Sequence, residues 1–386
     1  MSEPTSETMQ ERASRWASTM SGYPVAGIHL AHADSWAGPG TTEVFTRERN
    51  EALQDDAMSL HATRAFGAGS RAMEEEPDPY RTCFERDRDR VLHAPAFRRL
   101  AGKTQVFVFP DDHQRTRMTH ALEVAQIAVS VARALGLNIA LAEAIALAHD
   151  CGHGPGGHAS EDALSPYLVE GYDHALWGAD ITLAPLNLCA ETLDGVRNHS
   201  WSRPAPLTPE GEVVSWADRI AYVCHDFEDA VAAGIVTPAM LPELVSLRCG
   251  MSRSRQLGTF VRGMISATIS TGRIGMTDHM AEALAQFRKF NYEQVYLRPA
   301  SAAQATAVIS LLRALVEHYA DRPNMLPELN QQLADGAHGV IAGSDVALRA
   351  AVTYVGGMTD RFACRQAVAL LGWQPDRLPQ GIGVSA

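Results

Sequence analysis

The stretch that decides the fold reads Ala148-His149-Asp150-Cys151-Gly152-His153-Gly154-Pro155-Gly156-Gly157-His158-Ala159-Ser160-Glu161. An Ala/Leu/Ile-rich segment over residues 139–150 predicts a helix that ends on an adjacent His-Asp pair. The Gly/Pro turn that follows does not serve core packing, but it lets the backbone approach a ligand closely. If a second helix starts after the turn, His158 and Glu161 share one face of it. The pattern therefore predicts a ligand-binding turn between two helices.

His149 and Asp150 form a candidate metal site, because imidazole nitrogen and carboxylate oxygen can ligate one ion together. His120 opens the preceding predicted helix, and Asp218 lies in a later helix with apolar neighbours at packing spacing. A buried carboxylate is costly without a partner, so Asp218 needs either a metal ion or an arginine such as Arg219. The spacing alone leaves both alternatives open.

The pair His158 and Glu161 also has two interpretations. It is either a functional couple beside the turn or a capping or surface pair of the second helix.

The chain from residue 78 onward has the apolar spacing of helices and no strand alternation or βαβ rhythm. We therefore predict an all-α fold without internal repeats and with few or no short strands, at most around residues 106–109 and 272–276. The first long helix has Thr119 as its N-cap and Gly136 as its stop. The predicted helices cover residues 119–135, 139–150, 212–233, 257–271, 277–296, 302–320 and 346–371.

The first 77 residues differ from the rest, because they mix Ser, Thr, Gly, Pro and charged residues without a sustained period. We predict a flexible or loosely packed N-terminal extension there. A short ordered piece over residues 25–36 is compatible with this prediction.

Composition excludes several classes of protein. Of the 386 residues, 46% are hydrophobic, which is enough for a substantial core, and the formal net charge of −12 provides no global basic field for nucleic acid or an anionic membrane. The six cysteines occur singly, which favours reduced thiols in a cytoplasmic protein. We find neither a secretory signal nor a run of about 18 apolar residues, so we expect no membrane helix.

The ordered set His120, His149-Asp150 and Asp218 resembles the H…HD…D signature of HD-domain metal phosphohydrolases. Neighbouring stretches resemble the deoxynucleoside triphosphate triphosphohydrolase (dGTPase-like) branch of that family, from about residue 78 to residue 373. These stretches are residues 84–90, 96–100, 103–107, 116–124, 147–161, 218–226, 295–299 and 357–361.

The resemblance implies an HD-domain helical fold with additional C-terminal helices. It implies an HD core over residues 78–235 and a C-terminal helical part over residues 236–386 that packs on it. The implied reaction is hydrolysis of a deoxynucleoside triphosphate (dNTP), dGTP or another, to a deoxynucleoside and inorganic triphosphate. The resemblance also implies a homo-oligomer, hexameric or dimer-based, in which a dNTP effector can bind at subunit contacts.

The resemblance assigns roles to individual residues. The implied metal ligands are His120, His149, Asp150 and Asp218, whose mixed donors favour Mn, Fe, Co or Ni, while Mg can still support activity. The implied catalytic residues are His158, held by Glu161, for proton transfer or assistance to the attacking water, and His153 for phosphate contact. The implied substrate-binding residues are Gln105, Tyr222 and Asp226 for the deoxyribose, and Arg117, Arg219 and His174 for the phosphates.

Within this assignment, Asp226 would accept from the 3′-hydroxyl, and Tyr222 would pack against C2′ and disfavour a ribose. For Arg117 and Arg219 an ordinary surface position or an ion pair with Asp218 is the alternative.

Two positions depart from the family pattern. Gly156 stands where relatives carry a bulky aromatic residue, which we expect to loosen the loop and to alter base selectivity or rate. Ala175 replaces a family asparagine.

Two other functions remain open. An HD phosphohydrolase could act on a different phosphoester, such as a nucleoside monophosphate or a modified nucleotide. A module without turnover could instead bind dNTP or single-stranded nucleic acid to regulate a partner, although a binding site has no need for the couple of His158 and Glu161.

Overall fold

The computed structural model describes residues 8–19, 21–41, 43–111, 113–327, 329 and 339–381. Parts of the predicted extension, residues 1–7, 20 and 42, therefore lie outside the described residues. The chain forms two units, Met1–Phe45 and Thr46–Ala386.

The described part of the first unit contains one helix and one β-hairpin. Helix α1 spans Met9–Thr19, and strands β1 (Tyr23–Val25) and β2 (Ile28–Leu30) pair antiparallel with Pro24 opposite His29. The two turn residues, Ala26 and Gly27, both have positive φ, as a tight hairpin turn requires. These strands fall in the N-terminal segment, whereas the positions 106–109 and 272–276 contain no strand.

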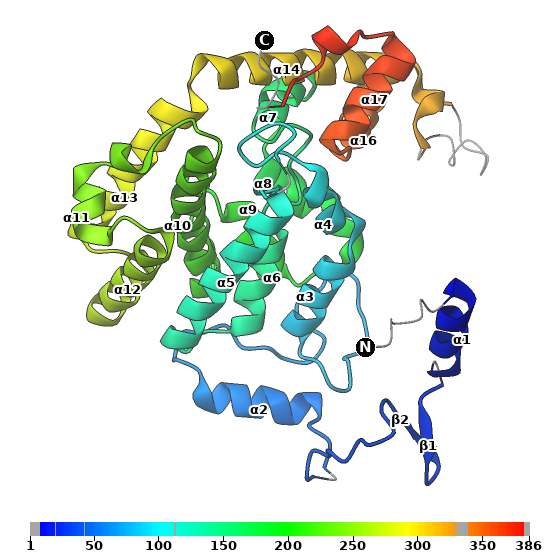
Figure 1. Ribbon diagram of the computed structural model, residues 1–386, viewed down its shortest axis with the longest axis vertical. Helices are drawn as coiled ribbons and strands as arrows, with labels where there is room; N and C mark the ends of the chain where they lie inside the picture. The colour runs from blue at the N-terminus through cyan, green and yellow to red at the C-terminus, as the bar shows by residue number, and fades with distance from the viewer. Residues whose placement is uncertain are drawn as a thin grey trace, which may run out of the picture. The chain divides into compact units, whose positions relative to one another are not determined.

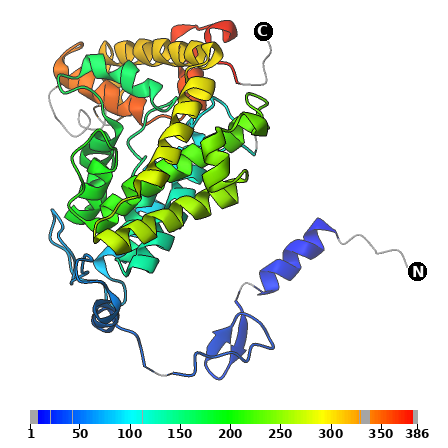
Figure 2. The ribbon, with the colours of Figure 1, turned by 90° about the vertical axis from the view of Figure 1, so that its left-hand side faces the viewer.

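The second unit is helical, which confirms the predicted all-α fold (Figures 1 and 2). Its first eight α-helices are α2 (Arg47–Ala57), α3 (Cys83–His93), α4 (Pro95–Arg99), α5 (Arg117–Leu135), α6 (Ile139–Ala148), α7 (Ala159–Leu164), α8 (His174–Trp177) and α9 (Ala190–Asn198). The later ones are α10 (Pro209–Ala232), α11 (Glu243–Cys249), α12 (Arg253–Thr271), α13 (Asp278–Asn291), α14 (Pro299–Ala320), α16 (Asp345–Gly356) and α17 (Asp360–Leu371). Single π-helical turns span Gly178–Thr182 and Tyr292–Tyr296.

The N-cap of helix α5 lies three residues before the predicted one, at Thr116 instead of Thr119. The Thr116 side chain accepts from the Thr119 N–H, and the Thr119 hydroxyl oxygen in turn accepts a hydrogen bond from the Thr116 backbone N–H at 3.0 Å. The two threonines form a reciprocal capping box, so Thr119 occupies the third position of the helix rather than its cap. The predicted stop is confirmed, because Gly136 ends α5 in the left-handed conformation.

Other boundaries also differ from the prediction. Thr208 caps α10, so this helix starts at Pro209 rather than at residue 212. The predicted helix 346–371 is two helices, α16 and α17, which Gly357 and the capping Thr359 separate. In each case a capping residue sets the end of the helix, and the apolar period alone does not locate that residue.

The buried apolar residues form two clusters. The first contains side chains from α3, α5, α6 and α10 to α13, and the second contains side chains from α7, α14, α16 and α17. Helix α6 is buried along almost its whole length, between α5, α3 and α10 (Figure 1). The His-Asp pair therefore follows directly from the most buried helix end of the core.

Helix α14 is long and apolar enough to cross a membrane by length and composition. Length and composition are weak evidence for a membrane span, since core helices of soluble proteins share both properties. The apolar side chains Leu311, Leu312 and Leu315 are buried in the second cluster, where α14 packs against α7, α16 and α17. The apolar character of α14 thus has a packing explanation.

Residues 46–77 belong to the helical body, so the predicted extension over residues 1–77 is too long. The buried Glu210 of α10 accepts hydrogen bonds from Thr63 N–H and hydroxyl at 3.0 and 2.6 Å, and from Asn138 N–H at 2.8 Å. Ser59 donates to the carbonyl of Leu135 at 2.6 Å. Hydrogen bonds rather than an apolar period attach this segment, which explains why periodicity did not detect it.

A buried ion pair joins the same segment to α3. Arg71 Nη1 lies 2.7 Å from Asp87 Oδ1, and the two side chains are 1% and 0% exposed. The other carboxylate oxygen of Asp87 accepts from Cys189 N–H at 2.8 Å and from the Thr192 hydroxyl at 2.7 Å. Both charges therefore have partners, which offsets their desolvation.

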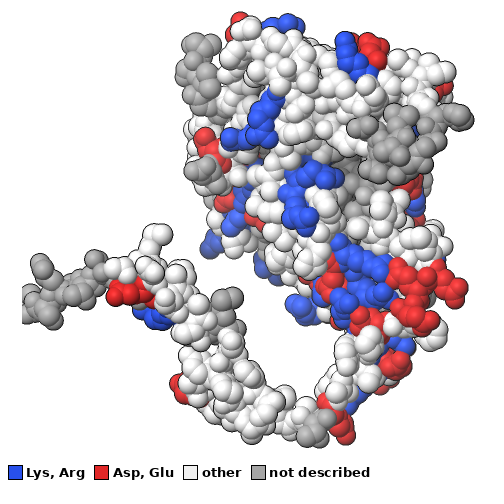
Figure 3. Space-filling view, turned by 90° about the vertical axis from the view of Figure 1, so that its right-hand side faces the viewer, with Lys and Arg blue, Asp and Glu red and all other residues white. Residues whose placement is uncertain are grey.

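Exposed ion pairs contribute less to stability than this buried pair does. Figure 3 shows that basic and acidic side chains lie beside one another over part of one face. Around α3, the exposed Arg81 pairs with Asp78 and Asp89. Solvent and salt screen such pairs, so each contributes at most about 1 kcal/mol.

We expect Asp87→Asn to lower the free energy of unfolding by about 3–5 kcal/mol, because it leaves the Arg71 charge buried without its partner. Denaturant unfolding followed by circular dichroism measures the change. The exposed pair of Arg349 and Glu170 provides the control, and Arg349→Ala should cost less than about 1 kcal/mol. Equal midpoints for Asp87→Asn and the parent protein would show that the Arg71–Asp87 pair does not stabilise the fold.

Candidate metal centre and active site

A cavity of about 770 Å³ opens beside the His-Asp turn. Its walls come from α5, α7, α8, α10, α13, α14 and the segment before α5. The structure brings all the predicted site residues except His149 to its lining, and His149 lies directly behind it. The lining residues among them are Gln105, Arg117, His120, Asp150, His153, His158, Glu161, His174, Asp218, Arg219, Tyr222 and Asp226.

Three of the predicted metal ligands face one another. The donor atoms of His120, His149 and Asp218 lie within 4.8 Å of each other. Asp218 Oδ1 is 3.0 Å from His120 Nε2 and 3.7 Å from His149 Nε2. Burial acts to raise the pKa of Asp218, but His120 and His149 hold this pKa below its ordinary value. Within the described residues Asp218 pairs with histidines and not with Arg219.

His149 carries the clearest sign of a cation site. Its Nδ1 lies 2.6 Å from the carbonyl oxygen of Ala146, and a carbonyl only accepts, so Nδ1 carries the hydrogen. The neutral ring then presents a lone pair at Nε2, which is buried without a hydrogen-bond partner. Asp150 Oδ1 and Asp218 Oδ1 lie 3.6 and 3.7 Å from this nitrogen. A lone pair beside two carboxylates is unfavourable without a cation, so the residues present fit a divalent metal ion.

Asp150 lies at the centre of the cluster. Its Oδ2 accepts from Arg117 Nη1 at 2.6 Å, and its Oδ1 is 3.1 Å from His153 Nε2. Burial acts to raise the pKa of Asp150, but Arg117, His149 and His153 keep it well below its ordinary value. Asp150 is therefore an ionised carboxylate with one oxygen turned toward the histidines.

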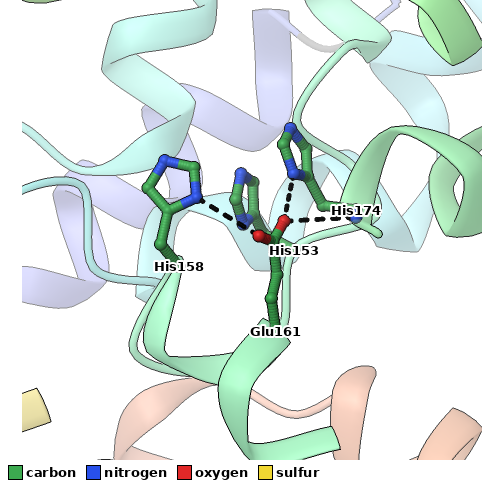
Figure 4. A group of neighbouring side chains, drawn as sticks. All are labelled: His153, His158, Glu161 and His174. Carbon is green, nitrogen blue, oxygen red and sulfur yellow. Dashed lines mark hydrogen bonds and ion pairs between the residues drawn. The ribbon is translucent and has the colours of Figure 1, made fainter. Parts of the chain in front are cut away.

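Four side chains from the turn, α7 and α8 form a second group (Figure 4). Glu161 lies between His158, at 3.7 Å, and His174, whose Nδ1 donates a short hydrogen bond to Glu161 Oε1. The ring of His174 stacks on that of His153 with centroids 3.7 Å apart. His158 is 74% exposed toward the cavity. Glu161 thus holds His174 more closely than the predicted partner His158.

Two of the predicted sugar-binding residues, Tyr222 and Asp226, lie at the side of the cavity near α13. Tyr296 donates a short hydrogen bond to Asp226 Oδ2, and Arg288 Nε donates to the Tyr222 hydroxyl at 2.8 Å. Burial raises the pKa of Asp226 to about 7. The Oε1 atom of Gln105 is buried without a hydrogen-bond partner. This end of the cavity is polar and contains the charged Arg288.

Neither Arg117 nor Arg219 has an ordinary surface position or an ion pair with Asp218, the two alternatives that the sequence left open. Arg117 is buried and pairs with Asp150, not with Asp218. Arg219 is half-buried, and its guanidinium stacks on the ring of Trp201 at 3.4 Å from the centroid. A guanidinium that stacks on an aromatic ring keeps its N–H groups, which point outward in its own plane, available to an anion.

The expectation that Gly156 loosens the turn is wrong. Gly156 has a φ of +75°, and a Cβ there would lie 2.4 Å from Val308 Cγ1. Its N–H donates to Asp360 Oδ1 at 2.9 Å, and Asp360 Oδ2 accepts from Thr104 N–H, also at 2.9 Å. Glycine is required by both conformation and space, and the buried Asp360 fixes the turn.

His199 is the functional candidate that sequence reasoning missed. It lines the cavity from the end of α9, and its ring centroid lies 5.0 Å from that of His149. Burial, then the neighbouring His149 and His174, lower its pKa to about 4. The only signal in the sequence for His199 was its position directly after a helix, a position that it shares with His149.

Comparisons with known proteins identify the family of the chain. The HD domain family matches residues 117–223, and the phosphohydrolase-associated domain matches residues 274–368. A deoxyguanosinetriphosphate triphosphohydrolase-like protein of Caldanaerobacter subterraneus subsp. tengcongensis is 38% identical over 324 residues, which cover 82% of this chain and 93% of the relative. A protein of the same description from Clostridium perfringens is 37% identical over 309 residues, covering 76% and 87%.

Among solved structures, a phosphohydrolase from Bacteroides thetaiotaomicron aligns with a TM-score of 0.47 and 19% identity, over 74% of this chain and 68% of that one. The sequence relatives decide the assignment, because their identity extends over most of both chains. By these matches, this chain belongs to the deoxyguanosinetriphosphate triphosphohydrolase-like family of HD-domain phosphohydrolases.

Proposed function

We propose that this protein hydrolyses dNTPs to a deoxynucleoside and inorganic triphosphate in a reaction that depends on a divalent metal ion. The observation that carries the proposal is the partnerless Nε2 of His149 between two carboxylates, at a cavity with space for a nucleotide. The names of the relatives support a triphosphate as substrate.

His120, His149, Asp150 and Asp218 would hold the metal ion. A divalent ion in this position would lower the pKa of bound water and neutralise phosphate charge. Two imidazoles and two carboxylates favour Mn, Fe, Co or Ni, with Mg as an alternative.

The chain's own groups supply the rest of the chemistry. In the proposed reaction a water oxygen bonds to the α-phosphorus, the bond from phosphorus to the 5′-oxygen breaks, and the leaving oxygen takes up a proton. His158 is the exposed ring at the cavity and has Glu161 within 3.7 Å, so it is suited to move a proton. His153 and His174, stacked behind it, would orient the phosphates.

Charge and shape would orient the two ends of the nucleotide. Arg219 lies at the cavity with its guanidinium on Trp201 and would donate to phosphate oxygens, while Arg117 would act through Asp150. At the other end Asp226 and Gln105 would bind the deoxyribose, and Tyr222 would exclude a 2′-hydroxyl. A neutral Asp226 avoids repulsion of a polyanionic substrate.

Family resemblance carries three further expectations, a homo-oligomer of hexameric or dimer-based form, a dNTP effector at subunit contacts, and a cytoplasmic location. Sedimentation with and without each dNTP tests the first two.

The direct test uses protein supplied with Mn, Co or Mg and each of the four dNTPs, singly and in pairs. We expect inorganic triphosphate as the product, and we expect His149→Ala and Asp218→Asn to abolish both turnover and tight Mn binding. Chromatographic separation of triphosphate from orthophosphate identifies the reaction. Orthophosphate as the sole product would favour another phosphoester, and dNTP binding without any product would favour a regulatory module.

A second prediction concerns proton transfer. His158→Ala should lower kcat by about 10²–10⁴-fold, because it removes the proposed proton-transfer group, and leave Mn affinity unchanged. Steady-state kinetics and a Mn titration measure the two effects. His61, an exposed histidine outside the cavity, provides the control, and His61→Ala should keep the parent kcat. An unchanged kcat in His158→Ala would remove this residue from the mechanism.

A third prediction follows from the raised pKa of Asp226. The unfolded chain releases this proton near pH 4 but the folded protein keeps it to about pH 7, so stability falls as the pH rises through this window. Relative to the parent, Asp226→Asn should gain roughly 2–3 kcal/mol in unfolding free energy between pH 5 and pH 8. Urea unfolding at both pH values measures this difference. A constant difference would mean that Asp226 titrates normally.

A further inference from the structure

Two cysteines that lie far apart in the sequence meet in the fold. All six cysteines are free thiols, and Cys83 and Cys189 are 1% and 0% exposed. A Cβ on Gly69 would lie 2.4 Å from Cys189 Sγ and 3.2 Å from Cys83 Sγ, so one small space beside this glycine contains both sulfur atoms. The Cys189 thiol is also the hydrogen-bonding partner of Cys83. The two sulfur atoms are therefore close neighbours.

Both cysteines stand at the N-terminus of a helix. Cys83 is the first residue of α3, directly after the N-cap Thr82, and Cys189 is the N-cap of α9. The Cys189 side chain makes no capping hydrogen bond to its own helix. The N–H groups at a helix N-terminus carry partial positive charge, which favours a thiolate over a thiol. The two helix ends thus create a setting in which one of these sulfurs can ionise.

The buried ion pair of Arg71 and Asp87 holds the two helix ends together. Arg71 forms a β-bridge with Cys189, and its Nη2 donates to the carbonyl of Cys83 at 3.0 Å. Asp87 accepts from the Cys189 N–H at 2.8 Å. The positions of the two cysteines are therefore fixed by backbone contacts, and neither position depends on a bond between the sulfurs.

Cys83 differs from the other cysteines in acidity. The hydrogen bond from Cys189 lowers the pKa of Cys83, although burial opposes this shift, and the same hydrogen bond raises the pKa of Cys189. Burial raises the pKa of the remaining thiols, which are Cys151, Cys224, Cys249 and Cys364. Because the thiolate is the reactive form of cysteine, Cys83 is the nucleophile of the pair.

A loop of small residues, 66–70, lies over the sulfur atoms. Phe66 and Ser70 are exposed, and the three residues between them are half-buried. Gly69 has a φ of +81° and places no side chain between the loop and the sulfurs. Local opening of a surface loop costs less free energy than global unfolding, so a small oxidant can reach the two thiols in the folded protein.

We propose that Cys83 and Cys189 form a redox-sensitive pair, which a peroxide converts to a disulfide between α3 and α9. The Cys83 thiolate attacks one peroxide oxygen, the O–O bond breaks, and Cys83 sulfenic acid forms while the second oxygen leaves as water after taking up a proton. The Cys189 sulfur then bonds to the Cys83 sulfur, and the sulfenic hydroxyl leaves with the Cys189 proton as a second water. The two thiols lose two electrons, which reduce the peroxide to two waters.

The disulfide would close a covalent loop of about 100 residues, which contains α5, α6, α7 and α8. It would also tie α3 to the helix that ends at His199 in the cavity wall. A cross-link over a loop of this length strongly restricts the unfolded chain, so the oxidised protein should resist heat better than the reduced one. This inference goes beyond the proposed function and does not depend on it.

Peptide mapping tests the proposal on the full-length protein. The protein is reduced, desalted, treated with hydrogen peroxide, blocked with N-ethylmaleimide and digested without reductant. Mass spectrometry should identify a cross-linked peptide pair that contains Cys83 and Cys189. Thermal unfolding followed by circular dichroism should shift upward by about 4–8 °C after oxidation, and dithiothreitol should reverse the shift. Cys364→Ser, which removes a cysteine outside the pair, should retain both effects, and Cys189→Ser should lose both.

Treated parent protein without this cross-link would overturn the proposal, whether Cys83 stays reduced, pairs with another cysteine or stops at sulfinic acid. A full thermal shift in folded Cys189→Ser would overturn it as well. If neither Cys189→Ser nor Cys189→Ala folds, the peptide map and the reversible shift of the parent protein decide. The readouts use no nucleotide, so absence of dNTP turnover would overturn the proposed function and leave the cysteine pair intact.

Discussion

The site depends on one local interaction, the hydrogen bond from a helix-ending histidine to the carbonyl three residues before it. His149 makes it to Ala146 at the end of α6, and His199 makes it to Val196 at the end of α9. The last carbonyls of a helix lack intrahelical partners, so the bond satisfies the backbone and fixes the histidine tautomer at once. Burial of α6 between α5, α3 and α10 then holds the lone pair of His149 in place.

The charges around these rings follow from the same arrangement. The nitrogen lone pairs in this buried space attract cations, and the carboxylates of Asp150 and Asp218 would balance the positive charge of a bound cation. Arg117, buried against Asp150, reduces the negative charge that would otherwise accumulate beside a polyanionic substrate. The net charge of −12 therefore says little about the ligand, because the local field at the cavity comes from a few buried groups and not from the surface.

The apolar period was sufficient to predict the helical fold, and the family resemblance singled out twelve residues that line part of the cavity. His199 was missed because a lone histidine after a helix has no periodic or motif signal, and only the fold brings it within 3.2 Å of His174. Gly156 was misjudged because the space beside it belongs to Val308, far along the chain. The attachment of residues 46–77 by hydrogen bonds to Glu210 escaped for the same reason.

The turn between α6 and α7 also depends on the C-terminal helices. Asp360, at the start of α17, binds the N–H groups of Gly156 and Thr104, and Lys103 donates to the carbonyls of His153 and Gly356, the latter at 3.1 Å. Lys103 is buried, and this burial, followed by the neighbouring Arg99, lowers its pKa to about 7. The backbone of the turn that carries His153 and His158 is consequently held by Asp360 and Lys103 as well as by its connection to α6.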